Sequence, residues 1–260
     1  MSRASLRRGI LATCAIGALV VAAGASGEGA LVEVDNLILR ADGNFQPQQL
    51  PKSKFLGINF QGHARIASKD GSRPVPLRQL VVNFDHDGRL GVAGLPTCPP
   101  QRIAAASTEE ARQLCASAIV GSGRIEATIS LSSGPVIAHS PLTIFNGPRD
   151  EEGHPTAVLH ARTTSPGTQV FAIVVPIEKR RGEYRYRATV DVPVIAAGLG
   201  SLTFIEAKLG RRYRAGGKDR SYVAARCRDG ILRTRGRFDF EDGTVIEGSV
   251  EKFCRALPPG

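Results

Sequence analysis

The segment Tyr184-Arg185-Tyr186-Arg187-Ala188-Thr189-Val190-Asp191-Val192 alternates between apolar and polar side chains from end to end. Because successive side chains of a β-strand point to opposite faces, this pattern predicts a strand with one buried face and one face in water. Similar short runs predict further strands at 31–40, 55–67, 78–85, 124–132, 136–145, 156–163, 168–178, 201–209, 221–228, 231–240 and 244–254.

Turn signals separate many of these runs. The dipeptide Asp-Gly suits the left-handed backbone of tight hairpin turns, and it occurs at Asp42-Gly43, Asp70-Gly71, Asp87-Gly88, Asp229-Gly230 and Asp242-Gly243. About a dozen short strands with Gly and Pro turns predict a mainly β fold, an antiparallel β-sandwich or barrel.

One short α-helix is predicted at about 107–118. Ser107 and Glu110 have the spacing of a capping box, and Gly121 marks the end. The residues that would share the buried face of this helix are Ala111, Leu114, Cys115 and Ala118.

The N-terminus has the pattern of a secretory signal. Arg3, Arg7 and Arg8 precede an uncharged run at 9–27, and Ala23-Gly24-Ala25 fits a small-residue cleavage site. We therefore expect a signal helix within 1–25, cleavage after Ala25 and a secreted or extracytoplasmic mature chain without a transmembrane segment. A retained anchor, a lipoprotein signal and twin-arginine export are the alternatives.

The mature chain, 26–260, has the composition of a globular protein. The whole sequence of 260 residues is 42% apolar with a formal net charge of +10, which argues against a disordered chain. One β-rich domain accommodates this length, and the charged segment 146–155 is the candidate for an internal boundary. Residues 179–260 hold 18 of the 34 basic residues and 10 of the 24 acidic ones, so the positive charge is concentrated there.

The cysteines indicate disulfides. Cys14 lies in the signal, and an even number of four remains, as is typical of an exported protein. Their spacing favours Cys98–Cys115 and Cys227–Cys254 among three possible connectivities, and the second pairing also rests on strands 221–228 and 244–254 being neighbours. A zinc site is the weaker interpretation, because there is no CxxC motif and no histidine within five positions of these cysteines.

No motif predicts a catalytic centre, a metal site or a cofactor. The five histidines form no HExxH, and there is no GxSxG nucleophile motif. Asp85-His86-Asp87-Gly88 is similar to the start of a calcium loop, but the later acidic ligands are missing, which favours a hairpin turn.

Clustered arginines form the one candidate binding surface. Three of them alternate within 231–240 and would project from one strand face; the full candidate set is Arg211, Arg212, Arg214, Arg233, Arg235 and Arg237. If strands 201–209 and 231–240 are close, these charges merge into a patch for an anionic envelope polymer or a lipid surface. The alternative is a solvated face balanced by Asp239, Glu247 and Glu251. The absence of Trp argues against nucleic acid as a partner.

Across residues 65–255, the order of several motifs resembles a family of uncharacterised exported actinobacterial proteins. These motifs are Ser68-Lys69-Asp70-Gly71-Ser72, Gly94-Leu95-Pro96-Thr97-Cys98, Ala118-Ile119-Val120-Gly121-Ser122-Gly123, Phe145-Asn146-Gly147, Ser221-Tyr222, Ala225-Arg226-Cys227, Asp242-Gly243-Thr244 and Gly248-Ser249-Val250 before Cys254. Arg228 departs from the proline expected after the third of the four cysteines. The resemblance implies an exported, four-cysteine, β-rich protein and carries no activity.

The function expected from the sequence is a non-enzymatic binding or structural module that is secreted or associated with the cell envelope. The alternative is an extracellular hydrolase whose site is assembled from distant residues around His63, His139 or His160.

Overall fold

The computed structural model describes residues 29–257, so the predicted signal at 1–25 lies outside the described residues. Its centre is a 12-stranded antiparallel sheet. In sheet order the strands are β1 (Ala30–Val34), β2 (Leu37–Gln46), β5 (Asn59–Ser68), β13 (Gly200–Leu209), β8 (Ile119–Leu131), β9 (Gly134–Asn146), β10 (Thr156–Thr163), β11 (Gln169–Lys179), β12 (Tyr184–Asp191), β6 (Leu77–Asp85), β17 (Ile231–Phe240) and β18 (Val245–Phe253).

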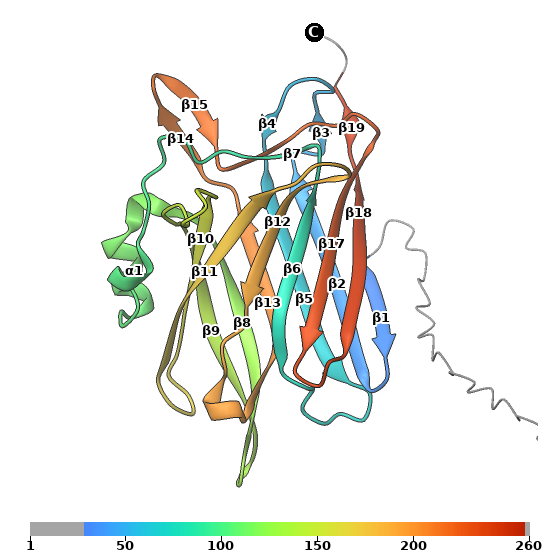
Figure 1. Cartoon of the computed structure of the whole chain (residues 1–260), viewed down its shortest axis with the longest axis vertical. Coiled ribbons are helices and arrows are strands. Elements are labelled where there is room, and N and C mark those ends of the chain that lie inside the picture. Colours follow the sequence, from blue (N-terminus) through green and yellow to red (C-terminus); the bar gives the residue numbers. More distant parts are fainter. Residues whose placement is uncertain (1–28, 258–260) are drawn as a thin grey trace, which may run out of the picture.

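The sheet curls into a nearly closed barrel, which confirms the predicted fold class. Figure 1 shows β12, β6, β17 and β18 passing in front of β13, β5 and β2, with β1 beside β18. The two edge strands meet where Gly248 of β18 approaches the side chains of Ala30 and Val32 of β1. One end of the barrel interior is filled by a cluster that includes Leu39 and Phe238 from opposite walls.

Three small sheets cover the other end of the barrel (Figure 1). They are the hairpin β14–β15 (Arg212–Ala215 and Lys218–Ser221), the three-stranded sheet β4–β16–β7 (Leu56–Gly57, Val223–Ala225 and Gly88–Leu90) and the parallel pair β3–β19 (Gln49–Leu50 and Arg255–Ala256). The predicted strand 221–228 is therefore wrong in its bounds, because the chain turns at Tyr222 from one small sheet into the next. The predicted strand 55–67 is likewise divided, into β4 and β5.

Four of the five Asp-Gly pairs lie at turns or bends, but Asp42-Gly43 lies inside β2. There, ten consecutive residues of β2 pair with β5, and this long ladder outweighs the local turn preference. The turn predicted at Asp42-Gly43 is therefore wrong. The chain turns earlier, at Asp35-Asn36, which divides the predicted strand 31–40 into β1 and β2; Asp35 has the positive φ of 50° that such a turn requires.

The predicted helix is shorter than expected. Helix α1 (Thr108–Leu114) has the predicted capping box: Glu110 N–H donates to Ser107 Oγ at 3.2 Å and Ser107 N–H to Glu110 Oε2 at 2.8 Å. The chain continues as the 3₁₀ helix η2 (Ala116–Ala118). Leu114 is 43% exposed rather than buried, because a helix of only two turns buries only a narrow stripe of its surface. Within residues 29–257, no helix is long and apolar enough to cross a membrane.

Both predicted disulfides are present. Cys98–Cys115 ties η2 and α1 to the loop before them, and Cys227–Cys254 ties the loop after β16 to the end of β18. The second pairing was expected because strands 221–228 and 244–254 would be neighbours. That reason is wrong: β16 pairs with β4 and β7, and the contact is made by loops.

Candidate functional site

The barrel interior contains a cavity of about 260 Å³. On one side it is bounded by Leu39, Leu80 and Phe238 of the large core cluster. On the other side it is bounded by Phe45, Ile58 and Ala225, which belong to a second cluster together with Cys227 and Cys254. We call this second cluster the cap. The cavity therefore lies between the filled end of the barrel and the cap.

Small inward side chains create this space. The alternation of β2 points Leu39, Ala41 and Phe45 inward; Leu39 and Phe45 are buried, but Ala41 between them is only half-buried. An inward side chain that keeps accessible surface borders a hollow rather than a packed core. Other small or short residues that face the cavity include Gly43, Gly62, Ala207, Thr234, Gly236 and Gly248.

A polar pair lies at the rim of the cavity, at the seam of the barrel. Strand β1 pairs with β2 only as far as Ala41, so the next residues of β2 face β18 directly. Here Lys252 Nζ lies 2.8 Å from Asp42 Oδ1. Burial of the Asp42 carboxylate opposes its ionisation, but Lys252 and the N–H of Gly43 outweigh it and lower the pKa of Asp42. An apolar cavity with a charged pair at its rim can hold a hydrophobic body and orient a polar end.

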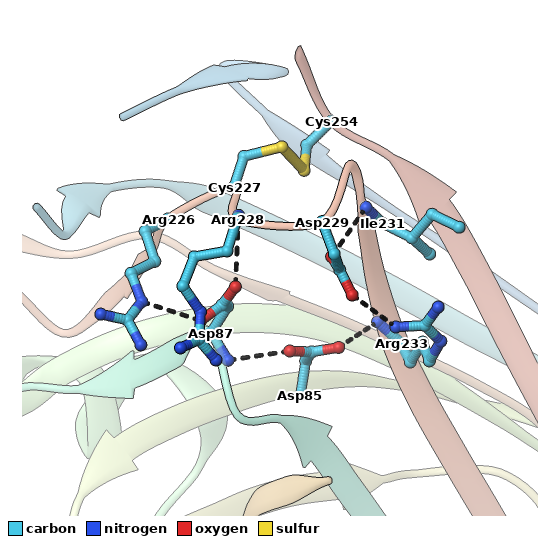
Figure 2. Close-up of a disulfide and its surroundings, with 9 residues drawn as sticks. All are labelled: Asp85, Asp87, Arg226, Cys227, Arg228, Asp229, Ile231, Arg233 and Cys254. Carbon is cyan, nitrogen blue, oxygen red and sulfur yellow. Dashed lines mark hydrogen bonds and ion pairs between the residues drawn. A yellow bond between two sulfur atoms is a disulfide. The ribbon is translucent and has the colours of Figure 1, made fainter. Parts of the chain in front are cut away.

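Asp85 and Asp87 form a second buried polar centre, next to the cap (Figure 2). Asp87 Oδ1 accepts hydrogen bonds from Arg226 Nε and is paired with Arg228 Nε, each at 2.8 Å. Asp85 accepts the N–H of Asp87 at 2.8 Å and that of Arg233 at 2.9 Å. Burial raises the pKa of Asp85 despite these donors. Hydrogen-bond donors of the protein therefore contact the carboxylate oxygens of Asp85 and Asp87. Through these contacts the turn anchors the loop that carries Cys227.

The arginines predicted on one strand face do project together from β17, but each is paired with acidic residues. Arg233 Nη1 lies 3.0 Å from Asp229, and Arg237 Nη2 lies 2.7 Å from Asp239. Arg235 pairs with Glu247, which also contacts Arg237. The positive charge of this face is thus balanced locally, which favours the alternative of a solvated, compensated face.

The other three candidate arginines lie elsewhere. Strands β13 and β17 are not neighbours, because β18, β1, β2 and β5 lie between them in one direction around the barrel. The condition on which all six charges would merge into one patch, that strands 201–209 and 231–240 are close, is therefore not met by the strand order. Arg211 borders an outer hollow next to β13, whereas Arg212 lines a cleft beneath the β14–β15 hairpin.

The three histidines of the hydrolase alternative are far from forming one site. His63 packs its ring 6.2 Å from that of Phe204 on the outer face of the barrel. His139 is exposed, with Glu126 3.8 Å away. His160 is fully buried on β10, and burial lowers the pKa of His160. Among the hydrogen bonds of residues 29–257, none joins a histidine to a serine.

Comparisons with protein-family models, with curated proteins and with solved structures find no match to this chain. The geometry of the site therefore carries the functional argument alone. Sequence reasoning did not find the cavity. The available signal was the small residues at inward positions of predicted strands, such as Gly62, Ala207 and Gly236.

Proposed function

We propose that the protein is an extracytoplasmic, non-enzymatic binding protein that holds a small apolar molecule inside its barrel. The observation that carries this proposal is the cavity of about 260 Å³ between the core and the cap, lined mostly by apolar side chains. Eight-stranded barrels can enclose a single small ligand in their interior, and binding sites are in general concave and mostly apolar with few polar groups.

The size of the cavity sets the size of the ligand. At about 30 Å³ per water-sized group, 260 Å³ holds about nine such groups. A linear alkyl chain of about eight carbons with one polar end fits this room, with the polar end at Asp42 and Lys252.

Two features support an extracytoplasmic location. The four cysteines of the described chain form two disulfides, which persist in oxidising compartments. The basic N-terminus, uncharged run and small-residue site at 1–25 have the order of a cleaved export signal.

Filling the cavity tests the function. We expect 1-octanol to bind the wild-type protein in isothermal titration calorimetry and Ala41→Leu to weaken this binding about 50-fold. The added leucine displaces about three methylene groups of the ligand, at about 0.8 kcal/mol each. The same substitution fills empty space, so the unliganded variant should melt at the same or a higher temperature than the wild type.

The matched control is Arg40→Leu, which adds a leucine at the neighbouring, outward position of β2. It should leave octanol affinity unchanged. 1-Pentanol, shorter by three carbons, should bind Ala41→Leu and wild type with similar affinity. Absence of octanol binding by the wild type, or equal octanol affinity in a folded Ala41→Leu variant, would refute the proposal.

A further inference from the structure

The β14–β15 hairpin covers a cleft of about 770 Å³. The hairpin lies at the capped end of the barrel (Figure 1). The walls of the cleft are closely packed. Tyr213 Oη on the hairpin lies 3.2 and 3.1 Å from the carbonyl oxygens of Gly91 and Ala93, which share its one hydroxyl hydrogen. A Cβ atom on Gly91 would clash with the carbonyl oxygen of Ser221, so the hairpin sits directly on the backbone beneath it. The cleft is therefore enclosed by closely packed elements of the fold.

Four cations line this cleft: Arg89, Arg212, Lys218 and Arg220. Among the described residues that line it, Asp219 is the one carboxylate. Within the described range, 29–257, none of the four cations forms an ion pair, in contrast to the paired arginines of β17. Arg220 Nε has the carbonyl of Ala215 as an acceptor at 3.4 Å. Four like charges beside one acidic group repel one another unless an anion enters, so the cleft favours an anionic ligand.

An aromatic ring positions one of these cations. The guanidinium of Arg89 lies 5.6 Å from the centroid of the Phe55 ring, and those of Arg185 and Arg226 lie 5.5 and 4.9 Å from it. Arg226 is itself held by the buried Asp87. Cations over a ring face are favourable contacts, so Arg89 is held in place before a ligand binds. Planar guanidinium groups match the oxygens of a phosphate group in two-point contacts.

We propose that this cleft binds the phosphate of an anionic lipid headgroup and docks the capped end of the barrel on a membrane surface. Lys52, Lys54 and the 38%-exposed Leu56 lie in and after the loop that leads to β4 at the same end. Basic residues beside an exposed apolar side chain are typical of a surface that meets an anionic bilayer. The cleft is also larger than a lone phosphate requires.

The cleft and the apolar cavity share a wall. On β16, Ala224 lines the cleft and the next residue, Ala225, lines the cavity. Docking through the cleft would therefore place the cap against the lipid surface. The proposal itself depends on the charges of the cleft, so it can fail while ligand binding in the cavity holds, and the reverse.

Vesicle co-sedimentation of the disulfide-bonded protein tests the docking. We expect binding to phosphatidylglycerol vesicles at low salt, little binding to phosphatidylcholine vesicles, and release as salt is added. Arg212→Gln with Arg220→Gln should weaken binding to phosphatidylglycerol about 30-fold, since each arginine near an anionic surface contributes about a factor of five. The control, Arg40→Gln with Arg78→Gln, removes the same charge from exposed arginines near the opposite end of the barrel and should retain most of the binding.

Three results would overturn the docking proposal. The first is absence of binding to phosphatidylglycerol vesicles, and the second is an equal loss in both double variants, which would indicate a net-charge effect. The third is that the wild type binds soluble poly(glycerol phosphate) in calorimetry but does not bind vesicles, and that the Arg212/Arg220 variant loses the polymer binding. This result would assign the cleft to an anionic polymer instead of a lipid. Octanol titration of the same variants shows whether the cavity is intact.

Discussion

His160 illustrates how the tertiary surroundings of one residue change its chemistry. On β10 its side chain is fully buried, with Nε2 3.2 Å from the carbonyl oxygen of Ala106, before helix α1. Its Nδ1 has no hydrogen-bond partner among residues 29–257. Burial disfavours the charged imidazolium, and the pKa of His160 is therefore lowered from its ordinary value of 6.5. The residue joins α1 to the sheet as a neutral group.

This shift predicts a pH dependence of stability. As pH falls below about 6.5, the unfolded chain binds a proton at His160 before the folded protein does. The stabilisation is therefore complete above this pH and is lost as pH falls toward the lowered pKa, by up to about 1.4 kcal/mol per pH unit. Urea unfolding at pH 7.5, 6.5 and 5.5 should show this slope in the wild type and a flatter one in His160→Gln. Identical slopes in the two proteins would contradict the assignment.

At the scale of elements, the β14–β15 hairpin depends on close backbone contact. It lies on the segment after β7, where Tyr222 O accepts the N–H of Gly91 at 2.8 Å. There is no room for a side chain at this position, because a Cβ on Gly91 would meet the Ser221 carbonyl. The hairpin forms one wall of the basic cleft, so its seating determines where Arg212 and Arg220 are held.

Gly91→Ala should therefore destabilise the protein by about 1–3 kcal/mol, the usual cost of overpacking, and weaken binding to phosphatidylglycerol vesicles. Chemical denaturation measures the first effect and co-sedimentation the second. Gly167→Ala is the matched control, because a Cβ there meets nothing within 4 Å; it should be neutral or slightly stabilising. If both variants have wild-type stability, the hairpin is not seated as described.

At the scale of the whole molecule, the barrel is filled at one end and capped at the other. The cap cluster combines Phe45 and Leu50 from the N-terminal part of the chain with Ala225 and the Cys227–Cys254 disulfide. The disulfide and the buried Asp87 together hold the loop at 226–230 (Figure 2). This loop follows Ala225, which lines the cavity. The second disulfide, Cys98–Cys115, packs instead in a separate cluster with Ile103 and Phe145, outside the cavity lining.

Removing each disulfide should consequently have different effects. Cys227→Ala with Cys254→Ala should cost about 3–4 kcal/mol of stability, as a loop of 27 residues predicts, and should also accelerate release of 1-octanol because the cap loosens. Cys98→Ala with Cys115→Ala should cost about 3 kcal/mol but leave octanol binding unchanged. Unfolding curves and calorimetry of both variants measure this. Equal octanol affinity and release in the two variants would contradict the role of the cap.

Several features of this protein follow from the sequence alone. Strand β12 forms where apolar and polar residues alternate at 184–192, and the capping box at Ser107 starts α1. The disulfides join the cysteines that are nearest in sequence. Each of these outcomes depends on residues close together along the chain, where side-chain direction, capping and loop length act without knowledge of the strand order.

Tertiary structure alone decided the candidate sites. The ladder between β2 and β5 outweighs the turn preference of Asp42-Gly43. The arginines of β17 pair with acidic residues of the neighbouring strand β18. Alternation points Ala41 and Ala207 inward, but whether large side chains fill the space between them depends on which strands face each other. Arg89 and Arg212 meet across one cleft although more than a hundred residues separate them. The order in which distant strands pair sets these juxtapositions, and local residue patterns do not encode that order.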